Sequence, residues 1–165
     1  MDAHSLLVKQ RLEKLENIKR LGFNPYPYSY NQTHHATEIL AKHSKLKKEE
    51  KTKDKVSIAG RIMTLRVMGK ASFGHIQDQS GKIQFYIRED KVGKKLYELF
   101  KNLDLGDIIG IKGTIFRTKM GEVSVWVKDL QLLSKSLEPL PEKWHGLKDK
   151  EIRYRQRHLD MISNP

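Results

Sequence analysis

The sequence predicts a mainly β fold, a five-stranded barrel with flanking helices. Two observations predict it: extended, β-like segments recur along the chain, and a single helical interval, residues 91–103, divides them. The extended segments lie at residues 56–67, 71–77, 82–88, 107–117 and 122–133. Five strands with a helix between the third and the fourth is the order of an OB-fold, a partly open Greek-key barrel that commonly binds oligonucleotides.

The first predicted element is an amphipathic helix over residues 4–21. Apolar residues recur there near helical spacing, and Gly22 stops the run. The opposite face is basic, and such a face is usually only solvated. It holds three candidate contacts to phosphates, Lys9, Arg11 and Lys14. Residues 24–30 contain two prolines and predict an extended connector.

A second helix is expected over residues 34–43, with Thr33 as its N-cap. Residues 45–55 are nearly all charged, which predicts an exposed or mobile segment and a boundary. After the barrel, a turn-rich stretch leads into a C-terminal linker helix that contains Arg153, Arg155 and Arg157. We therefore expect three regions: an N-terminal helical extension and connector (1–52), an OB-fold domain (53–134) and a linker (135–165).

Alternation along residues 72–77 assigns the side chains of the second strand to two faces. The inward face is expected to hold small or apolar residues and the outward face aromatic or polar ones: Ser72, Gly74 and Ile76, against Phe73, His75 and Gln77. A turn at residues 78–82, where Gly81 suits a positive φ, joins this strand to the next. Alternation alone leaves open whether Phe73 is instead a core residue. On the outside, its ring would offer a stacking platform for a base.

The net charge of +12 is spread along the chain, with +4 in residues 1–52, +6 in 53–134 and +2 in 135–165. An excess of basic over acidic residues that is spread over a folded domain favours a polyanionic partner. Nucleic acid is favoured over an acidic membrane because no lipid-binding helix is evident. The chain contains no cysteine, so disulfides and thiolate metal sites are excluded. It also has no apolar run of about 20 residues and no signal peptide, which predicts a cytoplasmic protein.

No catalytic constellation is evident. The glycines Gly69 and Gly74 lack the Lys-Ser or Lys-Thr pair of a P-loop, and no G-x-S-x-G nucleophile elbow is present. The adjacent histidines His34 and His35 have neither an HExxH pattern nor a carboxylate cluster beside them. We therefore expect no catalytic residue, no metal and no cofactor in this chain.

Recognition of a base requires a ring for stacking, polar groups for the base edge and cations for phosphates. Neighbouring strands supply candidate base-binding residues at Arg66, Phe73, His75, Gln84 and Glu122. A carboxylate beside a polyanion is disfavoured unless it accepts a hydrogen bond from a base, although Glu122 could equally be an ordinary residue after a turn. Further candidate phosphate contacts are Lys70, Lys112 and Lys119.

Four motifs carry a resemblance to a known family: VSIAGRIMTLRVMGKASFGHIQD at 56–78, GKIQFY at 81–86, DLGDIIGIKG at 104–113 and LPEKWHGLKDKEIRYRQRHLDMI at 140–162. They resemble the N-terminal part of class II lysyl-tRNA synthetases. The amino-acid sequence of the last motif favours the lysine enzyme over the aspartyl and asparaginyl relatives, which share the barrel.

The resemblance implies an anticodon-binding domain that reads the uridine-rich anticodon stem-loop of lysine tRNA. In that family Phe73 would stack on the central uridine and Gln84 would pair with its edge, while Arg66 and Glu122 lie near the other anticodon bases. The role of His75 is less defined, because the residue type varies at this position. The parent enzyme would attach lysine to tRNA using ATP and magnesium, as a homodimer, through a catalytic domain that this chain lacks, so the chain alone is not expected to be an enzyme.

Two other classes of function remain open at the level of sequence. One is a free-standing OB-fold protein that binds single-stranded nucleic acid without preference for an anticodon. The other is a scaffold whose basic face meets an acidic protein. Affinity for an unrelated single strand, and its dependence on salt, would separate these hypotheses.

Overall fold

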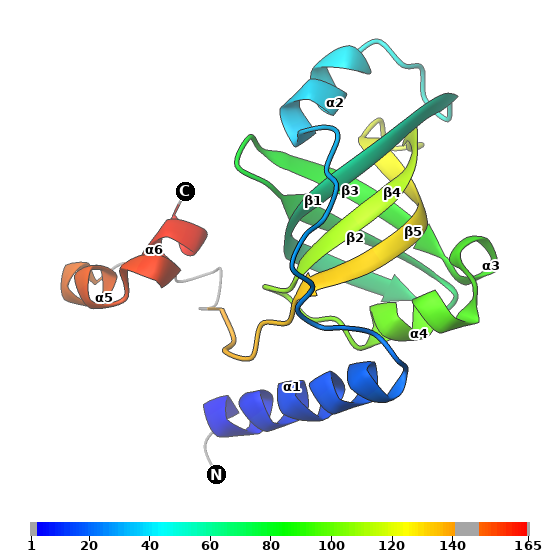
Figure 1. Cartoon of the computed structure of the whole chain (residues 1–165). Coiled ribbons are helices and arrows are strands. Elements are labelled where there is room, and N and C mark those ends of the chain that lie inside the picture. The colour runs from blue at the N-terminus through cyan, green and yellow to red at the C-terminus, as the bar shows by residue number, and fades with distance from the viewer. Residues whose placement is uncertain (1–2, 141–148, 165) are drawn as a thin grey trace.

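The computed structural model describes residues 3–140 and 149–164. The chain forms a β-barrel with helices at its ends, and Figure 1 shows α1 and α4 at one end and α2 at the other. The strands are β1 (Lys51–Met68), β2 (Ala71–Gln77), β3 (Lys82–Arg88), β4 (Ile108–Arg117) and β5 (Val123–Ser134). The helices are α1 (Ala3–Arg20), α2 (Ala36–Lys42), α3 (Glu89–Val92), α4 (Lys94–Lys101), α5 (Lys150–Arg155) and α6 (Arg157–Ser163).

The barrel closes in the order β1-β2-β3-β5-β4, with β3 and β5 parallel and the other pairs antiparallel. This architecture confirms the predicted fold class, and β2 and β3 have the predicted bounds. The strand β1 begins at Lys51 rather than at residue 56, so the second half of the charged run is not a loose segment. Lys51 and Lys55 pair with β4 while their side chains stay exposed, and this lets a highly charged sequence form a strand.

The second strand has the predicted faces. Ser72, Gly74 and Ile76 are buried, whereas the residues between them are only partly buried. A Cβ at Gly74 would lie 2.5 Å from the ring of Phe85 and 2.6 Å from the carbonyl oxygen of Thr64, so this close approach requires glycine. The ring of Phe85 thereby enters the barrel core.

The helical interval between β3 and β4 is interrupted. The sequence predicts one helix over residues 91–103, but Gly93, at φ +88°, separates α3 from α4. The second of these helices, α4, closes one end of the barrel with three buried side chains, Tyr97, Leu99 and Phe100.

Helix α2 begins at Ala36, and Thr33 is not its N-cap. The hydroxyl of Thr33 instead accepts a hydrogen bond of 3.2 Å from the backbone amide of Ser57 in β1. The prediction was wrong because the N-cap is His35, whose backbone amide donates to the Glu38 carboxylate at 2.9 Å, and the hairpin between β2 and β3 supplies acceptors for the next amides. Its Asp78 carboxylate accepts a bond of 2.9 Å from the amide of Ala36, and the Ser80 hydroxyl accepts one of 3.1 Å from the next amide of the helix.

The same aspartate organises the hairpin turn. Oδ1 of Asp78 accepts hydrogen bonds from the amides of Ser80 at 2.8 Å and Gly81 at 3.0 Å. Contrary to the prediction, Gly81 does not adopt a positive φ. The side chain of Asp78, rather than a left-handed glycine, therefore defines the geometry of the turn.

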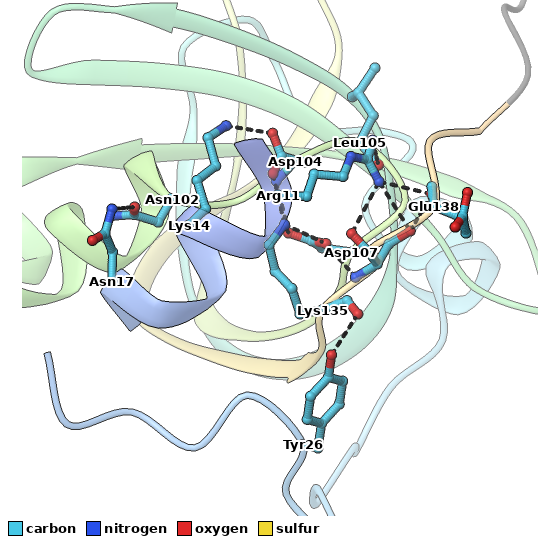
Figure 2. A network of polar contacts seen from close by, with 11 residues as sticks. Arg11, Lys14, Asn17, Tyr26, Asn102, Asp104, Leu105, Asp107, Lys135 and Glu138 are labelled. Atoms are coloured by element: carbon cyan, nitrogen blue, oxygen red, sulfur yellow. Dashed lines mark hydrogen bonds and ion pairs between the residues drawn. The ribbon is translucent and has the colours of Figure 1, made fainter. Parts of the chain in front are cut away.

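Arg11 joins α1 to the barrel rather than facing solvent. Its guanidinium is buried and donates to the carbonyl oxygens of Leu105 at 3.1 Å, Ser136 at 3.1 Å and Glu138 at 3.0 Å (Figure 2). This placement corrects the expectation of a phosphate contact, because the donors are already used within the chain. Amphipathic spacing could not reveal it, since the carbonyl partners are distant in sequence.

A buried ion cluster lies beside Arg11. The ammonium of Lys135 is fully buried and contacts Asp104 at 2.7 Å and Asp107 at 2.9 Å, and Lys14 contacts Asp104 at 2.5 Å (Figure 2). Burial raises the pKa of Asp107, with Lys135 opposing the shift. Burial also acts to raise the pKa of Asp104, but hydrogen bonds from Lys135 and Lys14 outweigh it and lower that pKa. Lys14 is therefore engaged with the barrel, which argues against the predicted phosphate contact.

The C-terminal linker helix is divided into α5 and α6 at Gln156. Arg153 and Arg157 both bind the buried carboxylate of Asp160, at 2.7 and 2.5 Å. This pairing brings the two short helices together. The turn-rich stretch predicted before them falls mostly on residues 141–148, outside the described residues.

Candidate nucleic-acid interface

A groove of about 490 Å³ opens on the outer surface of the barrel. It is bordered by β1, β2, β3 and the turn between β4 and β5. Its lining residues are Thr64, Leu65, Arg66, Met68, Phe73, Gly74, His75, Gln84, Thr118, Met120 and Glu122. The base-binding candidates chosen from the sequence all lie in this lining. We call it the base groove.

Phe73 lies on the outer face of β2 and is partly exposed, so it is not a core residue. Its ring stacks on that of Tyr86 in β3, with the centroids 4.4 Å apart and the planes inclined by 28°. The register explains the contact, because Phe73 and Tyr86 are direct cross-strand neighbours. Tyr86 thus supports the flat aromatic surface that stacking on a base requires.

A continuous chain of hydrogen bonds runs along the floor of the base groove. His75 contacts Thr64 through Nδ1 and Glu122 through Nε2, both at 2.7 Å. The amide of Gln84 donates to the other oxygen of Glu122 at 2.7 Å, and the Ser124 hydroxyl donates to Oε1 of Gln84 at 2.7 Å. Each polar group therefore has a fixed orientation.

This chain of bonds defines what the groove offers to a base. A neutral His75 that accepts from Thr64 and donates from Nε2 satisfies both of its contacts. Both oxygens of Glu122 are then hydrogen-bonded within the chain. A base that binds to Glu122 or Gln84 must exchange one of these bonds for its own.

Sequence reasoning missed the residues that support this arrangement, namely Thr64, Ser124 and Tyr86. Their types are common in strands, and no local motif marks them. The available signal was cross-strand register: Thr64 pairs with His75, and Ser124 pairs with Gln84. Register between distant strands is set by the barrel rather than by the sequence near each residue.

The cationic candidates are placed unequally around the base groove. Arg66 lines the groove, is exposed and forms no ion pair within residues 3–140 and 149–164. Lys70 is exposed in the turn between β1 and β2, and Lys119 is exposed in the turn that carries Met120 and Glu122. Lys119 lies 3.7 Å from Glu49. All three side chains are exposed, in the lining of the base groove or in a turn next to it.

The two remaining candidates lie outside the base groove. Lys112 is on β4, 3.9 Å from Asp129, and is exposed. Lys9 is exposed on α1, which contributes no residue to the groove lining. Neither of these two lysines lines the base groove.

The part of the chain that the structure describes contains no group of three or more His, Asp or Glu side chains arranged to hold a metal ion. Likewise, none of its described helices is long and apolar enough to cross a membrane.

Comparison with known proteins agrees with the barrel fold. Residues 56–133 match the family model of the OB-fold nucleic acid binding domain, tRNA anticodon type. The lysine–tRNA ligase of Carboxydothermus hydrogenoformans is 54% identical over 159 residues, which cover 96% of this chain and 32% of the relative. The lysine–tRNA ligase of Oceanobacillus iheyensis is 53% identical over 94% of the chain and 32% of the relative. That of Moorella thermoacetica is 50% identical over the whole chain and 33% of the relative. The chain thus spans about a third of the length of these relatives.

Proposed function

Because the chain belongs to the lysine–tRNA ligase family through its OB-fold nucleic acid binding domain, we propose that the barrel binds the anticodon loop of lysine tRNA. The observation that supports this most directly is the composition of the base groove. It combines a supported aromatic ring, Phe73, with a fixed amide, Gln84, and an exposed guanidinium, Arg66. These are the three components that single-stranded RNA recognition uses.

The proposed roles are those that the family resemblance implies, and the position of these residues in or beside the base groove supports them. Phe73 stacks on the central anticodon base, and Gln84 pairs with the edge of that base. Glu122 accepts a hydrogen bond from a neighbouring base, and His75 holds the carboxylate in place. Arg66, with Lys70 and Lys119 from the adjoining turns, contacts phosphates.

The chain spans about a third of the length of these relatives, so the complete activity is proposed only for a longer protein of which this chain would be a part. We propose that this protein joins lysine to tRNA with ATP and magnesium in the cytoplasm, acting as a homodimer. In this proposal the present chain supplies recognition of tRNA and carries out no catalysis by itself.

A fluorescence anisotropy titration with three RNA hairpins tests the proposal. The first carries the UUU anticodon, the second carries AAA in the same stem-loop, and the third carries the aspartate anticodon GUC. We expect the UUU hairpin to bind at least about tenfold more tightly than AAA at roughly 150 mM salt, a difference of about 1.4 kcal/mol. Tighter binding of GUC than of UUU would point to the aspartyl relatives.

Two other results would reject the proposal. Equal affinity for all three hairpins would indicate an OB-fold protein that binds single strands without regard to the anticodon. Absence of RNA binding at low salt would indicate that the basic surface binds an acidic protein instead, because contacts to phosphates strengthen as the salt concentration falls.

A further inference from the structure

A strip of aromatic rings leads away from the base groove along the outer face of the barrel, from the partly exposed Phe73 to Phe116, which is buried. Tyr86, which supports Phe73, also contacts Trp126 of β5 edge to face, with the centroids 5.3 Å apart. Trp126 in turn contacts Phe116 of β4 at 5.3 Å. The rings connect β2, β3, β5 and β4 without a gap, so the surface that begins at Phe73 continues beyond the proposed site.

The far end of this strip is a second groove, of about 630 Å³. Phe116 and Trp126 form its aromatic part, and Thr52 and Thr114 contribute hydroxyl groups. The remaining lining residues are all lysines: Lys51, Lys53, Lys55, Lys91 and Lys128. We call this the lysine groove.

Within residues 3–140 and 149–164, carboxylates leave most of the positive charge in the lysine groove unpaired. Lys51, Lys53, Lys55 and Lys128 form no ion pair with a carboxylate in the described residues, and Lys91 comes only within 3.9 Å of Asp90. Some lysines elsewhere on the surface do have a carboxylate partner, as Lys19 has in Glu16 and Lys101 in Glu98. Unpaired like charges around one groove repel each other, and they favour an anionic ligand.

One of these lysines is held in place by the aromatic strip. The ammonium of Lys51 lies 4.4 Å from the ring centroid of Trp126, within the range of a cation–π contact. The contact fixes a flexible side chain inside the groove while leaving its charge intact. The Lys51 ammonium is thus held in a position where it can bind a phosphate.

We propose that the lysine groove binds the ribose-phosphate backbone of the single-stranded nucleotides that flank the bases held in the base groove. The inference rests on the proposed function, because it concerns the same RNA. OB-folds cover about 4–16 nucleotides of single strand, which is more than one aromatic platform holds. The continuous strip provides the path, and the lysines provide the cations that an RNA backbone requires.

The test compares the 165-residue chain with the triple variant Lys51→Ala, Lys53→Ala and Lys55→Ala. The probes are fluorescent oligouridines of 4 and 12 nucleotides, titrated at several salt concentrations. The variant is expected to lose at least about tenfold in affinity for the 12-mer and less than about twofold for the 4-mer. Each lost phosphate contact should also reduce the slope of log K against log salt by about 0.7, so the 12-mer slope falls by about 2.

Two control variants isolate the position of the charge. Replacing Lys19, Lys95 and Lys101 with alanine removes the same charge from α1 and α4, and it should leave the affinity of the 12-mer within about twofold. Replacing the three groove lysines with arginine retains the charge, and it should preserve the slope. Thermal unfolding of every variant checks that the barrel is intact.

The outcomes separate this inference from the proposed function. If the groove variant and the α1–α4 control weaken 12-mer binding equally, the effect is one of net charge and the lysine groove is not a binding site. If the groove variant has no effect while Phe73→Ala weakens both oligonucleotides, the base groove stands and the lysine groove is rejected. If Phe73→Ala affects neither oligonucleotide, the proposed function itself fails.

Discussion

The side-chain amide of Gln84 donates a hydrogen bond of 2.7 Å to Glu122, although the two residues lie on different elements of the barrel. Ser124 fixes the other end of the amide by donating to its carbonyl oxygen at 2.7 Å. The amide therefore cannot turn freely. An edge-reading group held in this way loses less conformational entropy when a base binds than a mobile side chain would lose.

Replacing Phe73 with alanine should weaken binding of the UUU hairpin by about 1–3 kcal/mol, because a base loses its stacking surface. The ring lies on the outer face of β2, so the barrel should remain folded. Loss of its contact with Tyr86 should cost only about 0.5–1.5 kcal/mol of folding free energy. Anisotropy titration and thermal unfolding measure the two effects separately.

A matched pair of substitutions identifies stacking as the cause. Phe73→Tyr keeps a flat ring and should retain most of the affinity, whereas Phe73→Leu keeps an apolar side chain without a ring and should resemble alanine. Binding by the leucine variant at the original strength would show that apolar burial, rather than stacking, is what Phe73 contributes.

Replacing Glu122 with glutamine should reduce discrimination more than affinity. The carboxylate repels phosphates, so its removal should strengthen binding of the AAA hairpin. The glutamine variant also has one hydrogen-bond acceptor fewer for a base. A well-placed pair of hydrogen bonds typically contributes about 1–3 kcal/mol of discrimination. The ratio of UUU to AAA affinities should therefore fall by about tenfold, as measured by parallel titrations. A uniform change for both hairpins would place Glu122 outside base recognition.

Lys135 should be far more important for folding than Lys14, although both bind Asp104. Lys135 is fully buried and is the partner of the equally buried Asp107. Replacing it with methionine would leave that carboxylate without a counter-ion, at a cost of about 3–5 kcal/mol in the free energy of unfolding. Lys14→Met removes a partly exposed partner and should cost about 0–1 kcal/mol. Denaturant titrations compare the two, and equal losses would contradict this explanation.

The sequence predicted those parts of the fold that local patterns determine. Alternation put Phe73 and Ile76 on opposite faces of β2, because side-chain direction in a strand follows from position alone, but it left open whether Phe73 belongs to the core. The extended pattern also gave the bounds of β2 and β3. Alternation could not identify Lys51 as part of β1, since pairing with β4 outweighs the low strand propensity of a charged run.

Long-range hydrogen bonds account for the remaining errors. Arg11 fits the basic face of an amphipathic helix, yet its donors bind carbonyls 94 to 127 residues away. Thr33 fits an N-cap, yet the helix uses Asp78 from another element. In the base groove, likewise, the residue types were recognisable, but the bonds that orient them depend on which strands the barrel brings together.

Asp78 should make folding dependent on pH in the acid range. Burial acts to raise its pKa, but hydrogen bonds from the Ser80 hydroxyl and from the backbone amides of Ala36, Ser80 and Gly81 outweigh burial and lower that pKa. The folded pKa thus lies below the unfolded value of about 3.9. The ionised carboxylate contributes stability at pH values above the unfolded pKa, and this contribution is lost as the pH falls through the folded pKa.

The variant Asp78→Asn keeps an acceptor in the hairpin turn but removes the charge, so it isolates this effect. At pH 7 it should lower the free energy of unfolding by about 1 kcal/mol, within the range of a side-chain helix cap. The difference from the unaltered chain should shrink as the pH is lowered below about 4, because the native carboxylate then also becomes neutral. Glu13→Gln, an exposed substitution on α1, should show no such convergence. A difference at Asp78 that stays constant from pH 7 to pH 2, measured by denaturant unfolding, would mean that the shape of the side chain rather than its charge caps α2.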